Sequence, residues 1–212
     1  MAKRVVILDY GSGNLRSAER AVARVGADVE VTDDLGKAAR ADGLVVPGVG
    51  AYAACMAGIE QLGAGPTIAE RIRAGAPVLG ICVGMQILFE SGEEHGVVTK
   101  GLGLAPGEVK ALHAPVVPHM GWNTVNWPQD TVLGAGLPAD TRFYFVHSYA
   151  PTVIDAQAHD ARSQAGVRVA TAVHGEPFVA AFETDVLRAT QFHPEKSGDA
   201  GAALLTNWLG TL

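Results

Sequence analysis

The chain has 212 residues, of which 48% are hydrophobic and 18% charged, and a formal net charge of −6. This length and composition suit a single α/β domain over residues 1–212 with a well-buried sheet. The net negative charge, with both signs interspersed along the chain, argues against a nucleic-acid or anionic-membrane surface.

The two cysteines indicate a reducing compartment and no disulfide framework. The apolar run at residues 5–8 follows Lys3 and Arg4 but is cut off by Asp9, so no signal peptide is expected. No stretch is long enough to span a bilayer, and we expect a cytoplasmic protein. The seven histidines are scattered without ligand spacing, so the sequence predicts neither a metal site nor a cofactor.

Strands and helices alternate in the first half of the sequence. Apolar runs predict strands at 4–8, 28–32, 43–46 and 77–81, and helical spacing predicts helices at 15–25, 66–74 and 83–90. This alternation predicts a mostly parallel sheet with helices on both faces. Ligands of such sheets bind beyond the carboxyl ends of the strands, where the turns 9–14 and 47–50 and Cys82 should gather.

The second half is richer in strands and turns. We expect strands at 108–112, 121–127, 143–147, 167–173, 178–182 and 186–192, with a polar, alanine-rich loop at 155–164. Residues 200–209 are apolar at helical spacing and predict a packed terminal helix.

Cys82 lies between a predicted buried strand and a predicted helix, in the run Gly80-Ile81-Cys82-Val83-Gly84. This is the cysteine form of a strand-to-helix nucleophile elbow. The glycines should let the backbone turn sharply, so that the side chain between them projects from the sheet edge. A helix N-terminus then favours thiolate over thiol. The run predicts a nucleophile, and a buried structural cysteine is the alternative.

A second motif, His193-Pro194-Glu195, follows the last predicted strand. A thiolate nucleophile needs a base, and the base needs an orienting group. Pro194 favours an extended His193, and side chains two apart in an extended stretch point the same way. We therefore expect the Glu195 carboxylate to hold one imidazole nitrogen while the other faces Cys82. An ordinary surface turn is the alternative, but the two motifs together favour Cys-His-Glu catalysis.

Blocks spread over nearly the whole sequence carry a family resemblance; they are residues 9–17, 47–50, 80–86, 101–104, 117–123, 144–149 and 191–197. On these blocks the chain resembles the class I, triad-type glutamine amidotransferases. The resemblance implies a flavodoxin-like three-layer α/β sandwich with a mostly parallel central sheet and a nucleophile elbow. The blocks at 9–17, 118–123 and 144–149 resemble more specifically the glutaminase subunits that serve a cyclase subunit in histidine biosynthesis.

The resemblance implies hydrolysis of L-glutamine to glutamate and ammonia. Cys82 would attack the side-chain amide, His193 would transfer protons, and Glu195 would orient His193. The residues implied to bind the substrate are Gly48, Gln86, His147, Ser148 and Tyr149. Gln86 lies one helical turn past Cys82, so both can face one cleft.

The resemblance also assigns an oxyanion hole, because acyl transfer from an amide passes through a tetrahedral oxyanion that backbone N–H groups stabilise. Its donors would be the N–H groups of Val49, in the run Pro47-Gly48-Val49-Gly50, and of Val83, with Gly50 beside them. In the family the Val49 N–H can rest facing the wrong way until the enzyme is activated. Taken alone, the Pro-Gly-x-Gly run is more typical of an ordinary turn.

The turn at 9–14 contains Gly11-x-Gly13 after a strand, but position 16 is Arg, so we reject a dinucleotide-binding fingerprint. The resemblance implies instead that this turn faces a partner, a (β/α)₈ cyclase that receives ammonia through a tunnel and forms a heterodimer with this subunit. The implied contact residues are Gly11, Asn14, His119, Met120, Trp122 and Lys196. The isolated chain should then be nearly silent.

Three alternatives stay open. The chain could be a glutaminase for another synthase, such as that of the anthranilate or vitamin B6 pathway, a self-sufficient cysteine hydrolase or peptidase, or a non-catalytic binding subunit. Intact Cys82, His193 and Glu195 disfavour the last. Departures from the family pattern do not touch the triad; they are Ala76, His174, Ala189 and Thr190.

Overall fold

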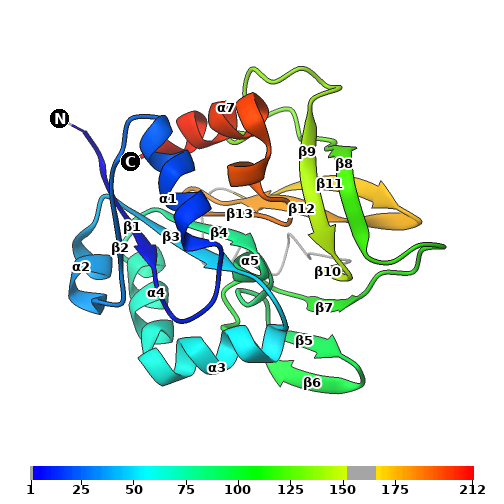
Figure 1. Cartoon of the computed structure of the whole chain (residues 1–212), viewed down its shortest axis with the longest axis horizontal. Helices are drawn as coiled ribbons and strands as arrows, with labels where there is room; N and C mark the ends of the chain where they lie inside the picture. The colour runs from blue at the N-terminus through cyan, green and yellow to red at the C-terminus, as the bar shows by residue number, and fades with distance from the viewer. Residues whose placement is uncertain (1, 152–165) are drawn as a thin grey trace.

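A seven-stranded sheet forms the centre of the molecule (Figure 1), in a computed structural model that describes residues 2–151 and 166–212. The loop expected at 155–164 lies outside the described residues. The strand order is β11-β12-β13-β4-β3-β1-β2. The strands are β1 (Arg4–Leu8), β2 (Asp28–Thr32), β3 (Gly43–Gly48), β4 (Val78–Cys82), β11 (Arg168–His174), β12 (Glu176–Glu183) and β13 (Leu187–Thr190).

The five strands from β13 to β2 pair in parallel, and β11 and β12 add an antiparallel edge. Every residue of β3 and β4 is buried, which explains why these two strands are continuous apolar runs in the sequence. The ladder sets Gly48 opposite Cys82, so the β3 turn and the elbow lie side by side at the carboxyl edge.

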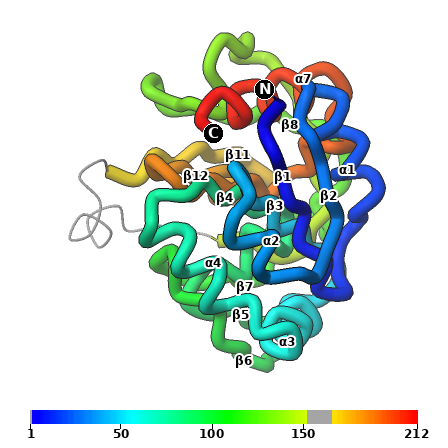
Figure 2. Tube along the Cα trace, turned by 90° about the vertical axis from the view of Figure 1, so that its left-hand side faces the viewer, coloured from blue at the N-terminus to red at the C-terminus, as the bar shows by residue number. Residues whose placement is uncertain are grey.

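Helices cover both faces of this sheet (Figure 1). On one face lie α1 (Leu15–Arg24) and α7 (Gly198–Leu209), and on the other lie α2 (Leu35–Arg40), α3 (Tyr52–Leu62) and α4 (Ala64–Arg73). The result is a three-layer α/β sandwich, as expected. Figure 2 shows the two termini close together, where the Lys3 ammonium donates to the Leu212 carbonyl. None of the described helices has the length and apolar character needed to cross a membrane.

Two smaller sheets complete the fold. One has the order β10-β7-β5-β6 and the other pairs β8 with β9. Their strands are β5 (Ser91–Glu94), β6 (Val97–Lys100), β7 (Glu108–Ala111), β8 (His119–Thr124), β9 (Arg142–His147) and β10 (Tyr149–Pro151). The expected strand at 121–127 therefore begins and ends earlier than its apolar pattern indicated.

The helix after the elbow is shorter than expected. Instead of extending over 83–90, α5 covers only Val83–Gln86. The carbonyls of Ile87 and Leu88 accept N–H groups from residues 102, 104 and 105, and Phe89 bonds back by an i to i−3 contact. Tertiary hydrogen bonds thus replace the helical ones and turn the chain into β5. The structure also adds α2, α3, β5, β6 and β10, for which the sequence patterns raised no expectation.

Candidate active site

Cys82 occupies the junction of β4 and α5 with φ 57° and ψ −116°. A positive φ is unfavourable for a residue with a side chain, and it is the strained turn of a nucleophile elbow. The cysteine itself therefore makes the sharp turn. We had expected the flanking glycines to make it. A Cβ on Gly84 would come within 1.9 Å of the Val46 carbonyl, and one on Gly48 within 2.3 Å of the Gly84 nitrogen. These glycines instead let β3 and α5 pack together.

His193 and Glu195 form a buried pair beside this elbow. His193 Nδ1 lies 2.7 Å from Glu195 Oε1, and the two side chains are only 2% and 4% exposed. With Nδ1 engaged, the other imidazole nitrogen is the one available to Cys82. Burial lowers the pKa of His193, but its hydrogen bonds with Cys82 and Glu195 outweigh burial and raise the pKa to about 9. A protonated imidazole beside sulfur favours the thiolate.

Glu195 reaches His193 by a route other than the one expected. His193 is extended, but residues Pro194–Lys196 form a 3-10 turn, η1, with Pro194 at its start. The carboxylate therefore folds back to the imidazole across a turn, and the alternation of an extended strand does not bring it there. The Ser197 hydroxyl donates to the His193 carbonyl at 2.6 Å and holds this turn closed.

A cleft of about 250 Å³ opens beside Cys82 and gathers most of the expected site residues; its lining is Val49, Gly50, Cys82, Val83, Gln86, Glu94, Val146, His147, Ser148, Tyr149, His193 and Lys196. Gly48 is not among them, because its Cα packs against α5. Glu195 lies behind His193, in a neighbouring small cavity. The structure adds Glu94 of β5, for which the sequence carried no signal.

The Val49 N–H, one expected oxyanion donor, is already engaged. It donates to the Ser12 hydroxyl at 3.3 Å, and the same hydroxyl donates to the Val49 carbonyl at 2.9 Å. The Cys55 thiol lies 3.1 Å from Ser12 Oγ and 3.5 Å from the Val49 carbonyl. Both backbone groups of Val49 are thus held by the turn that follows β1. Ser12 lies within the sequence block at 9–17, but no pattern there indicated this contact.

A row of hydrogen bonds holds His147 in the cleft wall. Its Nδ1 donates to the Tyr149 carbonyl at 2.9 Å, so its Nε2 accepts from His119 Nδ1 at 3.1 Å. His119 Nε2 in turn accepts from Asn123 at 3.3 Å, and its ring stacks on His174 with centroids 4.2 Å apart. Burial lowers the pKa of His147 to about 3 and that of His119 to about 4, so both are neutral. Both ring nitrogens of His147 are thus held by neighbouring groups of the cleft wall.

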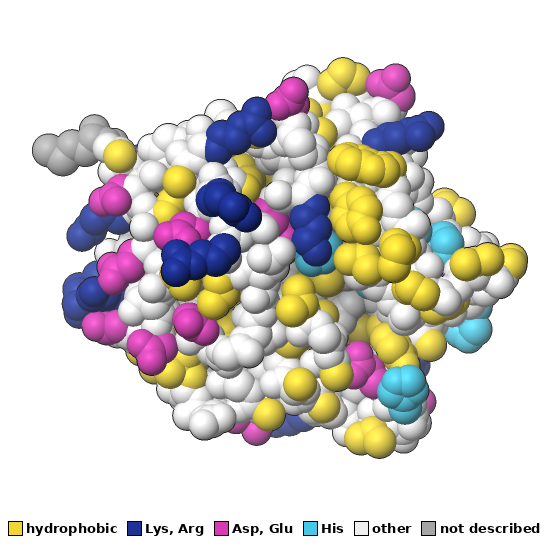
Figure 3. Space-filling model, in the orientation of Figure 1, with side chains coloured by type: hydrophobic (Ala, Val, Ile, Leu, Met, Phe, Trp, Pro, Cys, Tyr) yellow, Lys and Arg dark blue, Asp and Glu magenta, His cyan; other side chains and the backbone are white. Residues whose placement is uncertain are grey.

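The residues expected to face a partner divide into two groups. Met120 and Trp122 are 63% and 54% exposed on β8, and Gly11, Asn14 and Lys196 are exposed as well. His119 is 5% exposed, because alternation along β8 turns it inward, so it is not a surface residue of this chain. Figure 3 shows hydrophobic side chains gathered over the half of the molecule where β8 and β9 lie.

Within the described residues, no three His, Cys, Asp or Glu side chains are grouped so that they could hold a metal ion. A strained, buried cysteine at the carboxyl edge of a parallel sheet, with a His-Glu pair beside it, defines a thiol-dependent acyl-transfer site.

Comparison with known proteins agrees with this class. The family model of glutamine amidotransferase class-I matches residues 6–211. The chain is 60% identical over 211 residues to the imidazole glycerol phosphate synthase subunit HisH of Streptomyces coelicolor, covering 100% of this chain and 95% of that protein. It is 59% identical over 212 residues to the same subunit of Thermobifida fusca, covering 100% of both chains.

Among solved structures, PurLQS from Thermotoga maritima matches with a TM-score of 0.74 and 19% identity over 99% of both chains, which supports the fold. The chain belongs to the class-I glutamine amidotransferases and, within them, to the HisH subunits of imidazole glycerol phosphate synthase. Its activity is accordingly that of a glutamine amidotransferase, the release of ammonia from glutamine.

Proposed function

We propose that Cys82, His193 and Glu195 hydrolyse L-glutamine and that the ammonia passes to a cyclase subunit for histidine biosynthesis. The observation that carries this assignment is the buried Glu195–His193 pair, whose imidazole shares one cleft with Cys82 at the strained elbow. A peptidase of similar fold would share the elbow, but the 60% identity to HisH subunits extends over the whole chain.

The reaction follows from the protonation state of this pair. With the pKa of His193 at about 9, the imidazole carries a proton at neutral pH, and a protonated imidazole beside the sulfur favours a thiolate nucleophile. The thiolate attacks the side-chain amide carbon, and His193 gives its proton to the departing ammonia. The neutral imidazole then takes a proton from water, whose oxygen attacks the thioester and releases glutamate. Glu195 holds the ring in place through both steps.

The cleft offers complementary groups for the substrate. The Glu94 carboxylate lies in the lining and can receive the α-ammonium group of glutamine, while backbone groups at Ser148 and Tyr149 lie nearby. Glu94 is already anchored, because it accepts the Tyr52 N–H at 2.9 Å. The oxyanion would receive the N–H groups of Val83 and, once released from Ser12, of Val49.

The engaged Val49 N–H explains why the isolated subunit should be nearly silent. An oxyanion donor that points at Ser12 cannot stabilise the tetrahedral intermediate, and loss of one such donor costs on the order of 10²–10³ in rate. Gly11 and Asn14, in the same turn as Ser12, are exposed. A cyclase subunit that docks on this turn would therefore act directly on the Ser12 contact.

The test is glutamate release from glutamine by the chain in three states: alone, with the cyclase subunit of the same organism, and with that subunit plus its nucleotide ligand. We expect silence alone and turnover in the full mixture. Full activity alone would favour a self-sufficient hydrolase, and silence in all three states would point to a different synthase partner.

A Cys82→Ala complex supplies the control for the chemistry. It should release no glutamate, yet synthesis from added ammonia should be retained because the cyclase does not need the thiol. Loss of both activities would contradict a purely catalytic role for Cys82 and indicate a structural one.

A further inference from the structure

Gln191 is a fully buried amide beside the nucleophile, and the mechanism above gives it no role. Its Nε2 lies 3.8 Å from Sγ of Cys82, and the residue is 0% exposed. In the parallel β13–β4 ladder Thr190 stands opposite Ile81, so the next residue along each strand brings Gln191 beside Cys82. The Gln191 N–H donates to the Ala180 carbonyl at 2.8 Å and fixes the backbone there.

Gln86 determines which end of the Gln191 amide faces the sulfur. Its Nε2 donates to the Tyr149 carbonyl at 2.8 Å and to Gln191 Oε1 at 2.9 Å. Because a backbone carbonyl can only accept, the first bond identifies the nitrogen of Gln86, and the second then identifies the oxygen of Gln191. Gln191 therefore presents its N–H group, and not its carbonyl, to Cys82.

We propose that Gln191 is a catalytic residue whose side-chain N–H donates to the Cys82 sulfur and stabilises its thiolate form, with Gln86 as the positioning residue that aims it. Gln191 and His193 both follow the end of β13 and lie on the side of Cys82 where that strand pairs with β4. This inference rests on the proposed function only in taking Cys82 as the nucleophile.

The local structure gives a thiolate few other sources of stabilisation. Helix α5 has only four residues, which limits its dipole, so a buried anion depends on direct donors. His193 supplies a positive charge from one side. Burial raises the pKa of Tyr10 and of Cys55, which leaves both neutral at pH 7. The titratable groups that line the cleft or lie behind it are His193, Glu195, His147, Glu94, Lys196, Tyr10 and Cys55.

The proposal is tested by the pH dependence of Cys82 alkylation with iodoacetamide in the full-length chain. Gln191→Met keeps the volume but removes the donor, and Gln191→Glu replaces the donor with a carboxylate. We expect the pH midpoint of alkylation to rise by about one unit in Gln191→Met and further in Gln191→Glu. At pH values below the midpoint this corresponds to a roughly tenfold slower reaction in Gln191→Met.

Two control variants make the readout specific. Cys82→Ala reports any alkylation of the buried Cys55, which is subtracted. Gln61→Glu introduces the same charge change at an exposed position of α3 and should leave the midpoint unchanged. In the complex with the cyclase subunit, Gln191→Met should lower kcat for glutamine while KM changes little, because the donor acts on the nucleophile and not on the bound substrate.

An unchanged midpoint in a folded Gln191→Met chain, confirmed by its thermal unfolding, would overturn the proposal and assign Gln191 to packing. Gln191→Asn serves where Gln191→Met fails to fold, since it keeps an amide but withdraws it from the sulfur, and it should show the same rise in midpoint. Alkylation needs neither glutamine nor a partner. A chain that failed to hydrolyse glutamine would therefore leave this test of Gln191 intact.

Discussion

At the scale of single residues, Ser12 restrains the backbone of Val49, an expected oxyanion donor, through two hydrogen bonds. Each neutral hydrogen bond contributes about 1 kcal/mol net, so the pair favours the resting arrangement of Val49 by about 2 kcal/mol. Ser12→Ala should therefore raise glutamate release by the isolated chain roughly thirtyfold, because the Val49 N–H becomes free to turn toward the substrate.

Ser12→Thr is the matched control, since it keeps the hydroxyl and should keep the low activity. Glutamate release in the absence of any cyclase subunit is the measurement. A folded Ser12→Ala chain with unchanged or lower activity would show that Ser12 does not restrain Val49.

The elevated pKa of His193 has a consequence for stability. Groups that raise the pKa of a histidine from 6.5 to about 9 stabilise the folded chain. This stabilisation is fully present below pH 6.5 and is lost as the pH rises through about 9. The unfolding free energy of the parent chain should thus exceed that of His193→Asn by up to about 3 kcal/mol near neutral pH, with the gap closing by pH ~10.

Urea unfolding of both chains across this pH range measures the gap. In a Cys82→Ala background this difference in unfolding free energy should be smaller, because Cys82 is one of the two groups that raise the pKa of His193. A gap that is independent of pH would show that the imidazole is neutral in the folded chain.

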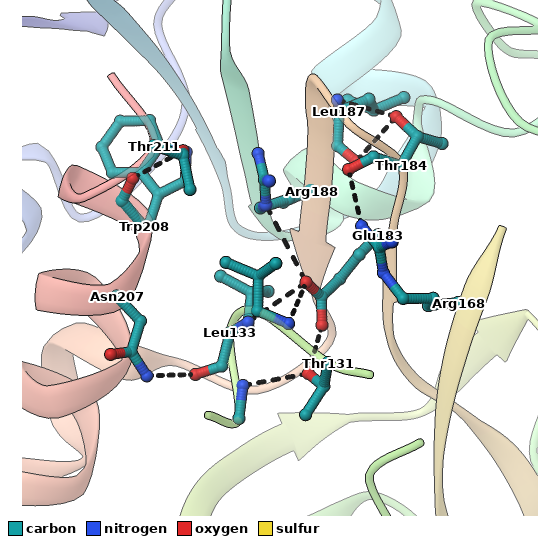
Figure 4. A network of polar contacts seen from close by, with 12 residues as sticks. Thr131, Leu133, Arg168, Glu183, Thr184, Leu187, Arg188, Asn207, Trp208 and Thr211 are labelled. Carbon is teal, nitrogen blue, oxygen red and sulfur yellow. Dashed lines mark hydrogen bonds and ion pairs between the residues drawn. The ribbon is translucent and has the colours of Figure 1, made fainter. Parts of the chain in front are cut away.

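At the scale of elements, a buried carboxylate ties the loop after β8 to the central sheet (Figure 4). Glu183, at the end of β12, accepts the N–H groups of Val132 at 2.9 Å and Leu133 at 3.1 Å, and also the Thr131 hydroxyl. Its oxygen lies 3.8 Å from Arg188 Nε on β13, and the two side chains are 2% and 4% exposed. The loop and the β12–β13 pair are thereby joined.

Glu183→Ala should destabilise the chain by about 3–5 kcal/mol, because it leaves the Arg188 charge buried without its partner and three donors without their acceptor. The unfolding free energy from urea titration is the measurement. Glu60→Ala, at an exposed position of α3, should change it by less than about 0.5 kcal/mol. A loss below 1 kcal/mol in Glu183→Ala would mean that water replaces the carboxylate.

The parts of the fold that were predictable are those whose signal is local. The strands at 4–8 and 28–32 have the expected bounds, and β3 and β4 are recognisable because both of their faces are buried. The length of α5 was not predictable, because hydrogen bonds from residues 102–105 end that helix. The same holds for η1, where Pro194 starts a turn that brings Glu195 back to His193.

The candidate site likewise contains some residues that were predictable from the sequence and others that were not. Cys82 and the His193–Glu195 pair were predictable because each motif carries its chemistry within a few residues. Ser12 contacts Val49 across 37 residues, and Gln191 contacts Cys82 across 109. Such pairs are set by the order of strands in the sheet, and a single sequence contains no pattern for them. His119 was misplaced because β8 begins two residues earlier than expected, which reveals the alternation that turns His119 inward.

At the scale of the whole molecule, the carboxyl edge of the sheet combines the catalytic cleft with the expected docking surface. Lys196 lies in both, because it is exposed, lines the cleft and follows Glu195 directly. Met120 and Trp122 extend this surface along β8 as exposed apolar side chains of the kind enriched at interface cores. Contact made by a partner here is therefore only a few residues from His193.

Lys196→Ala should weaken binding of the cyclase subunit and the activation of glutamine hydrolysis while leaving the unfolding free energy unchanged. An exposed lysine that pairs with an acid on a partner contributes little to folding but becomes partly desolvated on docking, where such pairs are worth more. Titration calorimetry with the cyclase subunit and glutamate release in the complex are the two measurements. Lys37→Ala, at an exposed site on α2, is the matched loss of charge and should alter neither. If Lys196→Ala bound and activated like the parent chain, the docking surface would have to lie away from η1, and the short connection to His193 would not exist.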